Sequence, residues 1–511
     1  MNLIEKTIGI FSPQKALKRE LARKHLKIVN SGYSYHGASR TKKSLLGWIS
    51  RGGSPKEDIE DNIEILRERS RDLYMGAPLA TGALKTTRTN VVGSGLKLKS
   101  QIDASFLGLS EKEADEWEST VEREFSLWAD SVNCDLQRMN NFYELQQLAF
   151  LSALMNGDCF ATLPLTKRVN AIYDLRINLI EADRICDPIN KGQKNISGGI
   201  EFNEDGELVA YHVLNIHPLS NNYKKKEWKR IEAFGEITGR PNILHLMDAE
   251  RVGQRRGVPV LAPVIESLKQ LTRYSEAELM AAVISGMYTV FIETKSNDND
   301  IPLGSAIPEE MEVDSQDENS YELGNGAIIA LNEGEQIKEA NPGRPNTAFD
   351  GFVTSICRQI GSALEIPYEL LTKHFTASYS ASRAALLEAW KMFKMRRSWL
   401  ASDFCQPIYE EWLAEAVAKG RINAPGFFDD PLIRKMYSLA EWNGPTQGQI
   451  DPLKEVTAAT KRVEQGFSTR AKETVELTGG DFHKNHRQRM KEEKMRLEIE
   501  NLRGDSSNAN S

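Results

Sequence analysis

Apolar residues recur three or four positions apart on both sides of a proline between residues 349 and 404. The first group comprises Phe349, Phe352, Val353, Ile356, Ile360 and Leu364. This spacing predicts a helix with one buried face. Pro367 ends it, because proline lacks an amide donor and forces the preceding residue out of helical geometry. After a polar segment a second helix is predicted from about Ser382, with an apolar face made of Leu386, Trp390, Phe393, Leu400 and Phe404.

The same periodicity predicts four more long helices: residues 58–74, a helix after Ser110, residues 142–155 and residues 258–287. Ser110 and Glu113 have the spacing of a capping box, in which each side chain bonds the other's free backbone amide. The helix at 258–287 has prolines only at its start, where a missing amide donor does least harm. The apolar face of this helix comprises Leu261, Ile265, Leu268, Leu271, Leu279, Ala282 and Val283.

Short β-rich stretches separate these helices. Strands are predicted at CFATLPL (159–165), around Leu175, Ile177 and Leu179, on both sides of Asp205-Gly206, and at NILHLM (242–247). Asp205-Gly206 is a typical hairpin turn. Two further β-rich pieces lie at 287–293 and 326–334. The pattern predicts an α+β fold, and 511 residues exceed what one core usually fills, so several domains are expected.

Charge is distributed unevenly along the chain. The net charge is −7, but residues 1–51 carry eleven Lys and Arg against Glu5 and Glu20, which leaves a net charge of −16 on the remainder. We interpret the basic segment as a solvated arm, with a docking arm for a protein or nucleic acid as the alternative. An acidic body argues against tight wrapping of DNA, since phosphate affinity comes largely from Lys and Arg contacts. It does not argue against DNA passing by.

A second charged segment lies between the two β-rich pieces. Residues 298–339 contain twelve Asp and Glu against Lys338 alone. A solvated acidic loop and a protruding module that binds a partner protein are about equally consistent with this composition. Elsewhere no run of about 18 apolar residues occurs, and the N-terminus lacks the apolar core of a secretory signal, so neither a membrane span nor secretion is expected.

No catalytic or metal-binding motif emerges. There is no phosphate-binding G-x-x-x-x-G-K-[ST], no H-E-x-x-H and no G-x-S-x-G. The five cysteines (Cys134, Cys159, Cys186, Cys357 and Cys405) are far apart and are expected to be reduced. His483 and His486 lack further ligands nearby. We therefore expect no enzyme, cofactor or metal; a cysteine hydrolase using Cys159 with His212 or His245 is the weakest alternative.

Several sequence blocks occur in a fixed order: RDLYMGAPLATGALKTTRTNVVGSGLKL (71–98), NGDCFATL (156–163), LIEADRI (179–185), RRGVPVLAPVIESLKQLTRYSEAELMAA (255–282), IPYELLT (366–372), FCQPIYEEWL (404–413), AVAKGRI (416–422) and IDPLKEVTAA (450–459). No block is diagnostic alone. In this order they closely resemble the portal proteins of lambda-type tailed bacteriophages, over about residues 60–480.

The resemblance implies the portal fold, in which copies of one chain form a closed ring, usually of twelve subunits, at one capsid vertex. It assigns residues 1–55 to a flexible arm, 56–255 to an α/β wing, 258–287 and 348–366 to two stem helices, 288–347 to a small β-containing clip, 367–381 to a tunnel loop, 382–425 to a long helix of the inner wing or crown, and 426–511 to a helical C-terminal region with a disordered tail.

The same resemblance implies a passive function. The ring would let double-stranded DNA enter and leave the capsid without sequence-specific contacts. It would dock terminase during filling, contact the major capsid and scaffold or protease proteins, and then accept head-completion or tail-connector proteins. The expected location is the virion, with assembly in the host cytoplasm and no membrane contact. A capsid adaptor that forms no channel is the main alternative.

The resemblance also places candidate functional residues. The tunnel-loop candidates are Lys373, His374, Phe375 and Tyr379. Five basic residues of the following helix either face the channel or pair with acids of a neighbouring subunit, and pairing is favoured: Arg383, Lys391, Lys394, Arg396 and Arg397. The clip candidates for partner docking are Glu309, Glu310, Glu312, Asp314, Asp317 and Glu318.

Overall fold

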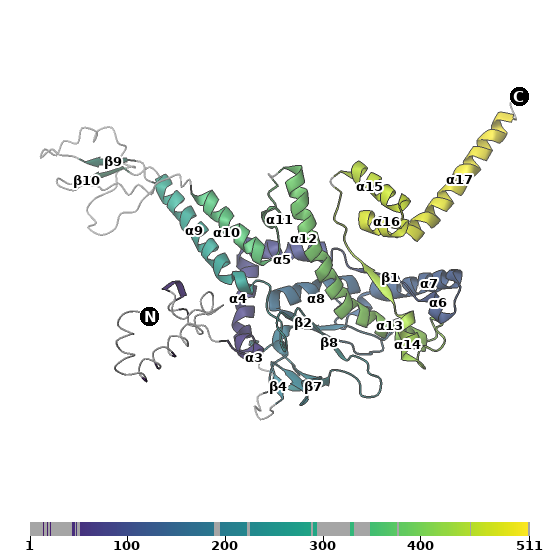
Figure 1. The fold of residues 1–511 in the computed structure, drawn as a ribbon, viewed down its shortest axis with the longest axis horizontal. Coiled ribbons are helices and arrows are strands. Elements are labelled where there is room, and N and C mark those ends of the chain that lie inside the picture. The colour runs from purple at the N-terminus through teal and green to yellow at the C-terminus, as the bar shows by residue number, and fades with distance from the viewer. Residues whose placement is uncertain are drawn as a thin grey trace. The chain divides into compact units, whose positions relative to one another are not determined.

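The computed structural model describes residues 52–188, 195–221, 225–287, 290–293, 328–331, 348–375, 378–449 and 451–508, together with residues 43–45 and the isolated positions Gln14, Lys18, Leu21 and Trp48. By its contacts the chain divides into two compact units, Met1–Ser54 and Pro55–Ser511. The second unit contains all the described sheets and long helices (Figure 1).

The helices of the second unit are α3 (Pro55–Asp58), α4 (Ile63–Gly76), α5 (Pro78–Val91), α6 (Ala104–Leu107), α7 (Glu111–Ala129), α8 (Phe142–Asn156), α9 (Ile265–Met287), α10 (Phe349–Ala363), α11 (Tyr368–Thr372), α12 (Tyr379–Leu400), α13 (Gln406–Ala418), α14 (Pro431–Tyr437), α15 (Pro452–Glu464), α16 (Arg470–Thr478) and α17 (Phe482–Asn508). Single turns include η5 (Ala182–Arg184) and η6 (Ala262–Val264). The mixed composition of helices and strands confirms the predicted α+β class.

The strands are β1 (Lys97–Ser100), β2 (Asp158–Thr162), β3 (Asn178–Ile180), β4 (Ile196–Ser197), β5 (Ile200–Phe202), β6 (Leu208–Leu214), β7 (Trp228–Glu232), β8 (Ile243–Met247), β9 (Val290–Glu293), β10 (Ile328–Leu331) and β11 (Ala440–Asn443). They form four small sheets with the orders β1-β11, β10-β9, β3-β2-β8 and β4-β5-β6-β7. All described pairs are antiparallel except β9 with β10.

Local sequence signals set several element ends as predicted. The Ser110 side chain accepts from the Glu113 amide while Glu113 bonds the Ser110 amide, so the capping box at the start of α7 is confirmed. Ala77 separates α4 from α5, and Gly157 follows the end of α8. The hairpin at Asp205-Gly206 joins β5 to β6.

Other boundaries differ from the prediction. The helix expected from residue 258 begins at Ile265, because the segment with two prolines forms a turn closed by the Ala262 amide on the Pro259 oxygen and then the turn η6. The long helix expected after Ser382 contains a wider π-helical turn at Ala401–Cys405, and the Gln406 amide bonds the Ala401 oxygen. Pro407 removes the next amide donor, which accounts for the wider turn. Helix α17 continues to Asn508, into the segment expected to be a disordered tail.

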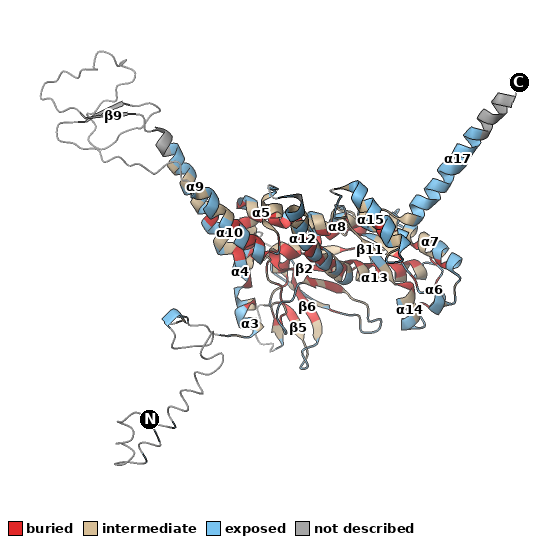
Figure 2. Ribbon diagram, turned by 45° about the horizontal axis from the view of Figure 1, so that its top comes forward, coloured by how far each residue is buried: buried red, intermediate tan, exposed pale blue. Residues whose placement is uncertain are grey.

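An aromatic cluster forms the centre of the main core, which appears red in Figure 2. The ring of Phe125 meets that of Trp412 nearly at right angles, with centroids 5.0 Å apart, and meets Phe142 and Tyr409 in the same way. Edge-to-face contacts of this kind add to the stabilisation from burial. They join α7, α8 and α13, so residues from both halves of the chain share one core.

Strand β2 separates this core from a smaller one. Cys159 and Ala161 face the main core, whereas Phe160 between them faces a second apolar cluster. This is the two-residue alternation of a strand that is buried on both sides. The second cluster comprises Phe160, Ile180, Ile185, Ile200, Tyr211, Val213, Ala233 and Ile243.

Two glycines allow the backbone before α9 to lie directly against the start of β2. A Cβ added at Gly257 would overlap the carbonyl oxygen of Gly157, and a Cβ at Gly157 would overlap the carbonyl oxygen of Gly257. Backbone surrounds both positions, so a side chain there has no room to turn aside.

We expect Gly257→Ala to destabilise the chain by about 3 kcal/mol or more, since the two backbones would have to separate. Gly82→Ala is the matched control. A Cβ at Gly82, inside α5, meets nothing within 4 Å, and the change should stabilise by about 0.5–1 kcal/mol. Urea unfolding measures both, and equal stability of the two variants would contradict the close approach.

Candidate functional site

Helices α9 and α10 form an antiparallel pair, which Figure 1 shows side by side. The Tyr274 ring lies 5.5 Å from Phe349 and 5.0 Å from Phe352, measured between centroids. Near the base of the pair Leu268 and Cys357 are buried in the main core. These two helices correspond to the predicted stem. None of the described helices is long and apolar enough to cross a membrane.

Toward the end of α9 and the start of α10, the helix pair exposes large apolar side chains. Leu279 is 65% exposed, Met280 58%, and Val283 and Phe352 are also open to solvent. Figure 2 shows the change from buried residues at the base to exposed ones along α9. Large apolar side chains that are exposed close together often mark an interaction surface.

The short helix α11 ends in the candidate tunnel loop. Lys373 has a left-handed backbone (φ 56°), and its amide and that of His374 both bond the Glu369 carbonyl oxygen. The side chains of Lys373, His374 and Phe375 are exposed. The structure therefore brings these three candidates together at the end of α11. The side chain of Tyr379 lies outside the described residues.

Three of the five basic residues of α12 pair with carboxylates of their own chain. Arg383 Nη1 lies 3.1 Å from Glu455 Oε1, Lys391 Nζ 2.6 Å from Glu388 Oε2, and Lys394 Nζ 3.2 Å from Glu476 Oε1. A fourth, Arg396, is largely buried with a guanidinium nitrogen 3.7 Å from Glu365 Oε2, and burial lowers its pKa. None of these contacts needs a neighbouring subunit.

The fifth basic residue, Arg397, anchors α12 to the end of α5. Its Nε donates to the Val91 oxygen (3.0 Å), and its Nη2 donates to the oxygens of Asn90 (2.9 Å) and Pro445 (2.8 Å). The guanidinium also lies 5.4 Å from the centre of the Trp390 ring. Burial lowers the pKa of Arg397 to about 10. This side chain has a structural role within one chain.

The six acidic clip candidates, Glu309, Glu310, Glu312, Asp314, Asp317 and Glu318, lie outside the described residues. Their role in partner docking stays a prediction.

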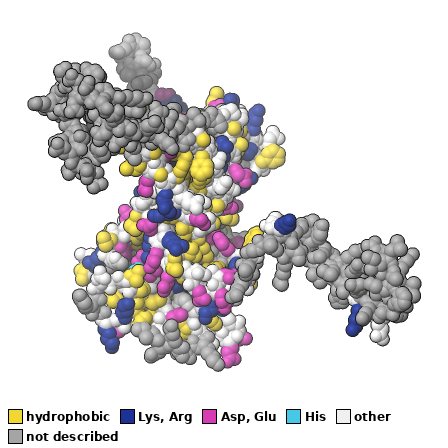
Figure 3. Space-filling view, turned by 90° about the vertical axis from the view of Figure 1, so that its left-hand side faces the viewer, with side chains coloured by type: hydrophobic (Ala, Val, Ile, Leu, Met, Phe, Trp, Pro, Cys, Tyr) yellow, Lys and Arg dark blue, Asp and Glu magenta, His cyan; other side chains and the backbone are white. Residues whose placement is uncertain are grey.

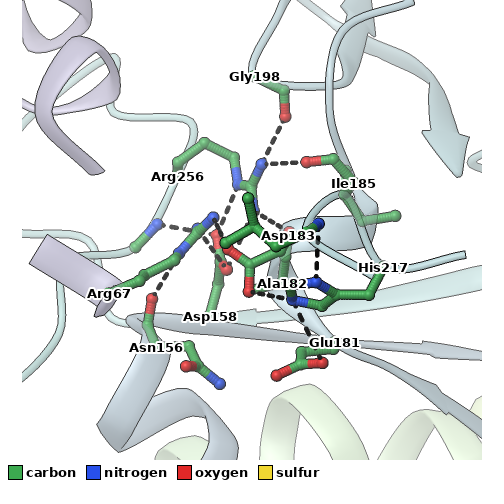
Figure 4. A network of polar contacts seen from close by, with 12 residues as sticks. Arg67, Asn156, Asp158, Glu181, Ala182, Asp183, Ile185, Gly198, His217 and Arg256 are labelled. Carbon is green, nitrogen blue, oxygen red and sulfur yellow. Dashed lines mark hydrogen bonds and ion pairs between the residues drawn. The ribbon is translucent and has the colours of Figure 1, made fainter. Parts of the chain in front are cut away.

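A buried network that sequence reasoning missed surrounds the carboxylate of Asp158 (Figure 4). Arg67 Nη2 donates to Oδ1 at 2.9 Å, and Arg256 Nε donates to Oδ2 at 2.7 Å. Arg256 Nη2 also donates to Oδ1 at 3.2 Å, and the Gly257 amide donates to Oδ2 at 3.1 Å. All three charged side chains are buried, with at most 3% of each exposed. One carboxylate thus joins α4, β2 and the segment that leads into α9.

The remaining donors of the Arg256 guanidinium are also satisfied, and Arg67 Nη1 lies 3.8 Å from Asp183 Oδ1. Arg256 donates to the carbonyl oxygens of Ile185 (2.7 Å), Gly198 (2.6 Å) and Ala182 (2.8 Å). Arg67 donates to the Asn156 carbonyl oxygen at 2.9 Å. Full satisfaction matters because a buried charge is tolerated only when it is paired and hydrogen-bonded.

The network fixes the charge state of its members. Burial alone would raise the pKa of Asp158, but the guanidiniums of Arg256 and Arg67 outweigh it and hold that pKa well below its usual range. Burial lowers the pKa of Arg67 to about 10, and it also lowers the pKa of His245, which favours a neutral imidazole. His245 Nε2 lies 3.5 Å from Asp158 Oδ2, too far for a strong hydrogen bond.

Beside this network, Glu181, Asp183 and His217 are the one group of the described residues with metal-ligand spacing. Arg71 already pairs with both carboxylates. The Leu219 amide donates to His217 Nδ1 at 3.1 Å, so the proton of a neutral ring is on Nε2 and points toward the acids. Nε2 then has no lone pair for a metal. We interpret Glu181, Asp183 and His217, together with Arg71, as an ionic network.

Cys159 does not form a catalytic pair in this structure. It is 2% exposed, and burial raises the pKa of its thiol to about 12. His245 stacks on Phe160, on the opposite face of the sheet from Cys159. His212 is instead 3.0 Å from Glu201. A thiol with a raised pKa and no adjacent base is a poor nucleophile.

The sequence matches the family described as phage portal protein, lambda family, over residues 41–397. The chain belongs to the lambda family of phage portal proteins. It is 25% identical over 477 residues to portal protein B of Escherichia phage lambda, covering 90% of this chain and 89% of that protein. It is 24% identical over 484 residues to the portal protein of Escherichia phage N15, with the same coverage of each.

Among solved structures, the chain is similar to a chain in the neck of an empty GTA particle, with 12% identity and a TM-score of 0.47, covering 81% of this chain and 92% of that one.

Family membership confirms the resemblance drawn from the ordered sequence blocks. The family match contains β2, α9 and α10, and therefore the Asp158 network and the predicted stem. Asp158 lies in the block NGDCFATL, and Arg256 lies in the block that begins RRGVPV. The presence of a carboxylate and an arginine in these two blocks is the signal in the sequence that pointed to this network.

We expect Asp158→Asn to destabilise the chain by about 3–5 kcal/mol, because it leaves two buried guanidiniums without their counter-charge. The folded-state pKa of Asp158 is depressed, so its contribution is fully present above the unfolded value of about 4 and is lost progressively as pH falls below it. Urea unfolding between about pH 3 and pH 7 should show a weaker acid dependence in the variant. An unchanged acid dependence would contradict this assignment.

Proposed function

We propose that the chain assembles into a closed ring that forms the DNA channel at one capsid vertex. The observation that carries the proposal is the antiparallel pair α9–α10, whose outer half exposes large apolar side chains that the described part of the chain leaves uncovered. Burying such side chains against the next copy of the chain would remove them from water. Family membership supports a ring, and twelve copies is the number that the portal resemblance implies.

We assign the subdivisions of the ring by order along the chain: wing 56–255, stem helices 258–287 and 348–366, clip 288–347, tunnel loop 367–381, inner wing or crown 382–425, and C-terminal region 426–511. The expected partners are terminase during filling, the major capsid and scaffold or protease proteins, and later a head-completion or tail-connector protein. The expected location is the virion vertex, after assembly in the host cytoplasm.

The charges of the described residues favour DNA passage without tight binding. Four basic side chains of α12 already pair within the chain, which leaves them little capacity for phosphates. On the face drawn in Figure 3, Lys and Arg side chains lie among Asp and Glu, with no large patch of one sign. Since phosphate affinity grows with the number of cationic contacts, such a surface lets DNA slide. The exposed Lys373 and His374 are the proposed contacts.

The first test concerns ring closure. We expect Leu279→Glu to reduce the fraction of assembled rings by about tenfold or more, since it places a charge where apolar burial is proposed. Leu219→Glu is the matched control, because Leu219 is similarly exposed (69%) on a loop distant in sequence from the stem. Negative-stain end views and sedimentation velocity measure the outcome. A natural chain without ring-shaped end views would favour the non-channel adaptor.

The second test concerns the tunnel loop. Replacing Lys373 and His374 together by alanine should change packaged or retained DNA by roughly threefold or more and leave rings intact, because it removes the exposed side chains proposed to meet phosphates. Lys391→Ala is the control, since Lys391 is exposed and pairs with Glu388 of its own helix. Particle DNA content measures the effect. Loss of the rings instead would mean that the loop is structural.

A further inference from the structure

The three C-terminal helices α15, α16 and α17 (residues 452–508), here called the C-terminal module, take no part in the main apolar core. Neither the buried residues of that core nor the partly buried ones around it include a described residue beyond Trp442. Among the described side chains of the module, Ala459 is the one buried apolar residue. The helices of the module pack mainly on one another. Something other than apolar burial must hold the module in place.

Two ion pairs join the module to helix α12. Arg383 of α12 donates to Glu455 of α15 at 3.1 Å, and Lys394 of α12 donates to Glu476 of α16 at 3.2 Å. Glu455 is mostly buried, whereas Lys394 and Glu476 are each about half exposed. The two basic residues are eleven positions apart, three turns along the same helix. The module is therefore held at two separate points of α12.

A second set of charges joins the start of α17 to β1 and α7. Lys99 Nζ lies 3.2 Å from Asp481 Oδ2 and 3.0 Å from Glu122 Oε1. Lys484 Nζ lies 3.7 Å from Glu122 Oε2. Lys99 of β1 thus lies between two carboxylates, Asp481 just before α17 and Glu122 of α7. The contact is electrostatic here as well.

Two open pockets lie beside these ion pairs. One, of about 610 Å³, is lined by residues that include Trp390 and Lys394 of α12 and Val475 and Glu476 of α16. Another, of about 500 Å³, is lined by residues that include Arg383, Leu386, Glu455 and Leu477. Both pockets are partly open to solvent, so water has access to part of the contact between α12 and the module.

We propose that these ion pairs form a salt-sensitive latch, which holds the C-terminal module in one orientation and releases it as a body when the charges are screened or broken. Release exposes no described residue of the main core. The half-exposed Lys394 and Glu476 exchange each other for water at little cost, whereas the mostly buried Glu455 contributes more to holding the module. The pairs weaken as salt shortens the Debye length. We place the hinge at residues 444–449, which follow β11 and include Gly448 in the left-handed region (φ 80°).

The test compares protease cleavage of residues 444–449 in the assembled full-length protein. We expect Glu455→Lys with Glu476→Lys to speed cleavage there by about tenfold. Adding Arg383→Glu and Lys394→Glu restores both ion pairs with their charges exchanged. The rate of cleavage should then return to within about twofold of the rate in the natural chain. Cleavage of the loop at 217–221 serves as the internal reference and should not change.

Glu464→Lys with Glu498→Lys is the charge-matched control, since both acids are exposed on the module away from the four latch residues; its cleavage rate should equal that of the natural chain. The latch would be overturned if Glu455→Lys with Glu476→Lys left the cleavage rate unchanged. It would also be overturned if the fourfold variant folded but did not recover the natural cleavage rate.

Salt provides a test that needs no variant. Raising salt from about 0.1 M to about 1 M shortens the Debye length from about 10 Å to about 3 Å. In the natural chain this should speed cleavage at 444–449 relative to the loop at 217–221, by about threefold or more. An unchanged ratio would overturn the proposal even if the charge-reversed variant failed to fold.

Discussion

The rest of the second unit depends on one buried carboxylate. Asp158 lies between two buried guanidiniums, Arg67 from α4 and Arg256 from the segment that leads into α9. Such a cluster is stable only when every charge and every donor is satisfied, so it tolerates one arrangement of the three segments. Because Arg256 lies nine residues before α9 begins, this arrangement also sets where the predicted stem leaves the wing.

Around this anchor, the second unit uses three kinds of contact for three purposes. The main core is closed by apolar burial around Phe125 and Trp412, which charge screening does not weaken. On the α9–α10 pair, the described part of the chain leaves large apolar side chains exposed. The C-terminal helices are attached by ion pairs, which are weak and adjustable.

The basic residues of α12 show how far composition can mislead. Five cations in fifteen residues suggest contact with DNA or a neighbouring subunit. In the structure Arg397 hydrogen-bonds three carbonyl oxygens of its own chain, and Arg383 and Lys394 reach Glu455 and Glu476. Arginine has several donors in a fixed plane, so it satisfies carbonyl groups at a helix end well. Only tertiary contacts reveal which cations remain available for phosphates.

The sequence by itself determined the local elements and the family. The capping box at Ser110, the turn at Asp205-Gly206 and the order of the blocks depend on residues close in the chain, so periodicity and turn chemistry suffice to find them. The tertiary structure alone decided the Asp158 network, whose partners Arg67 and Arg256 are 91 and 98 positions away, and the ion pairs of the C-terminal module. Contacts between distant residues follow from how elements pack, and one sequence carries no separate signal for that packing.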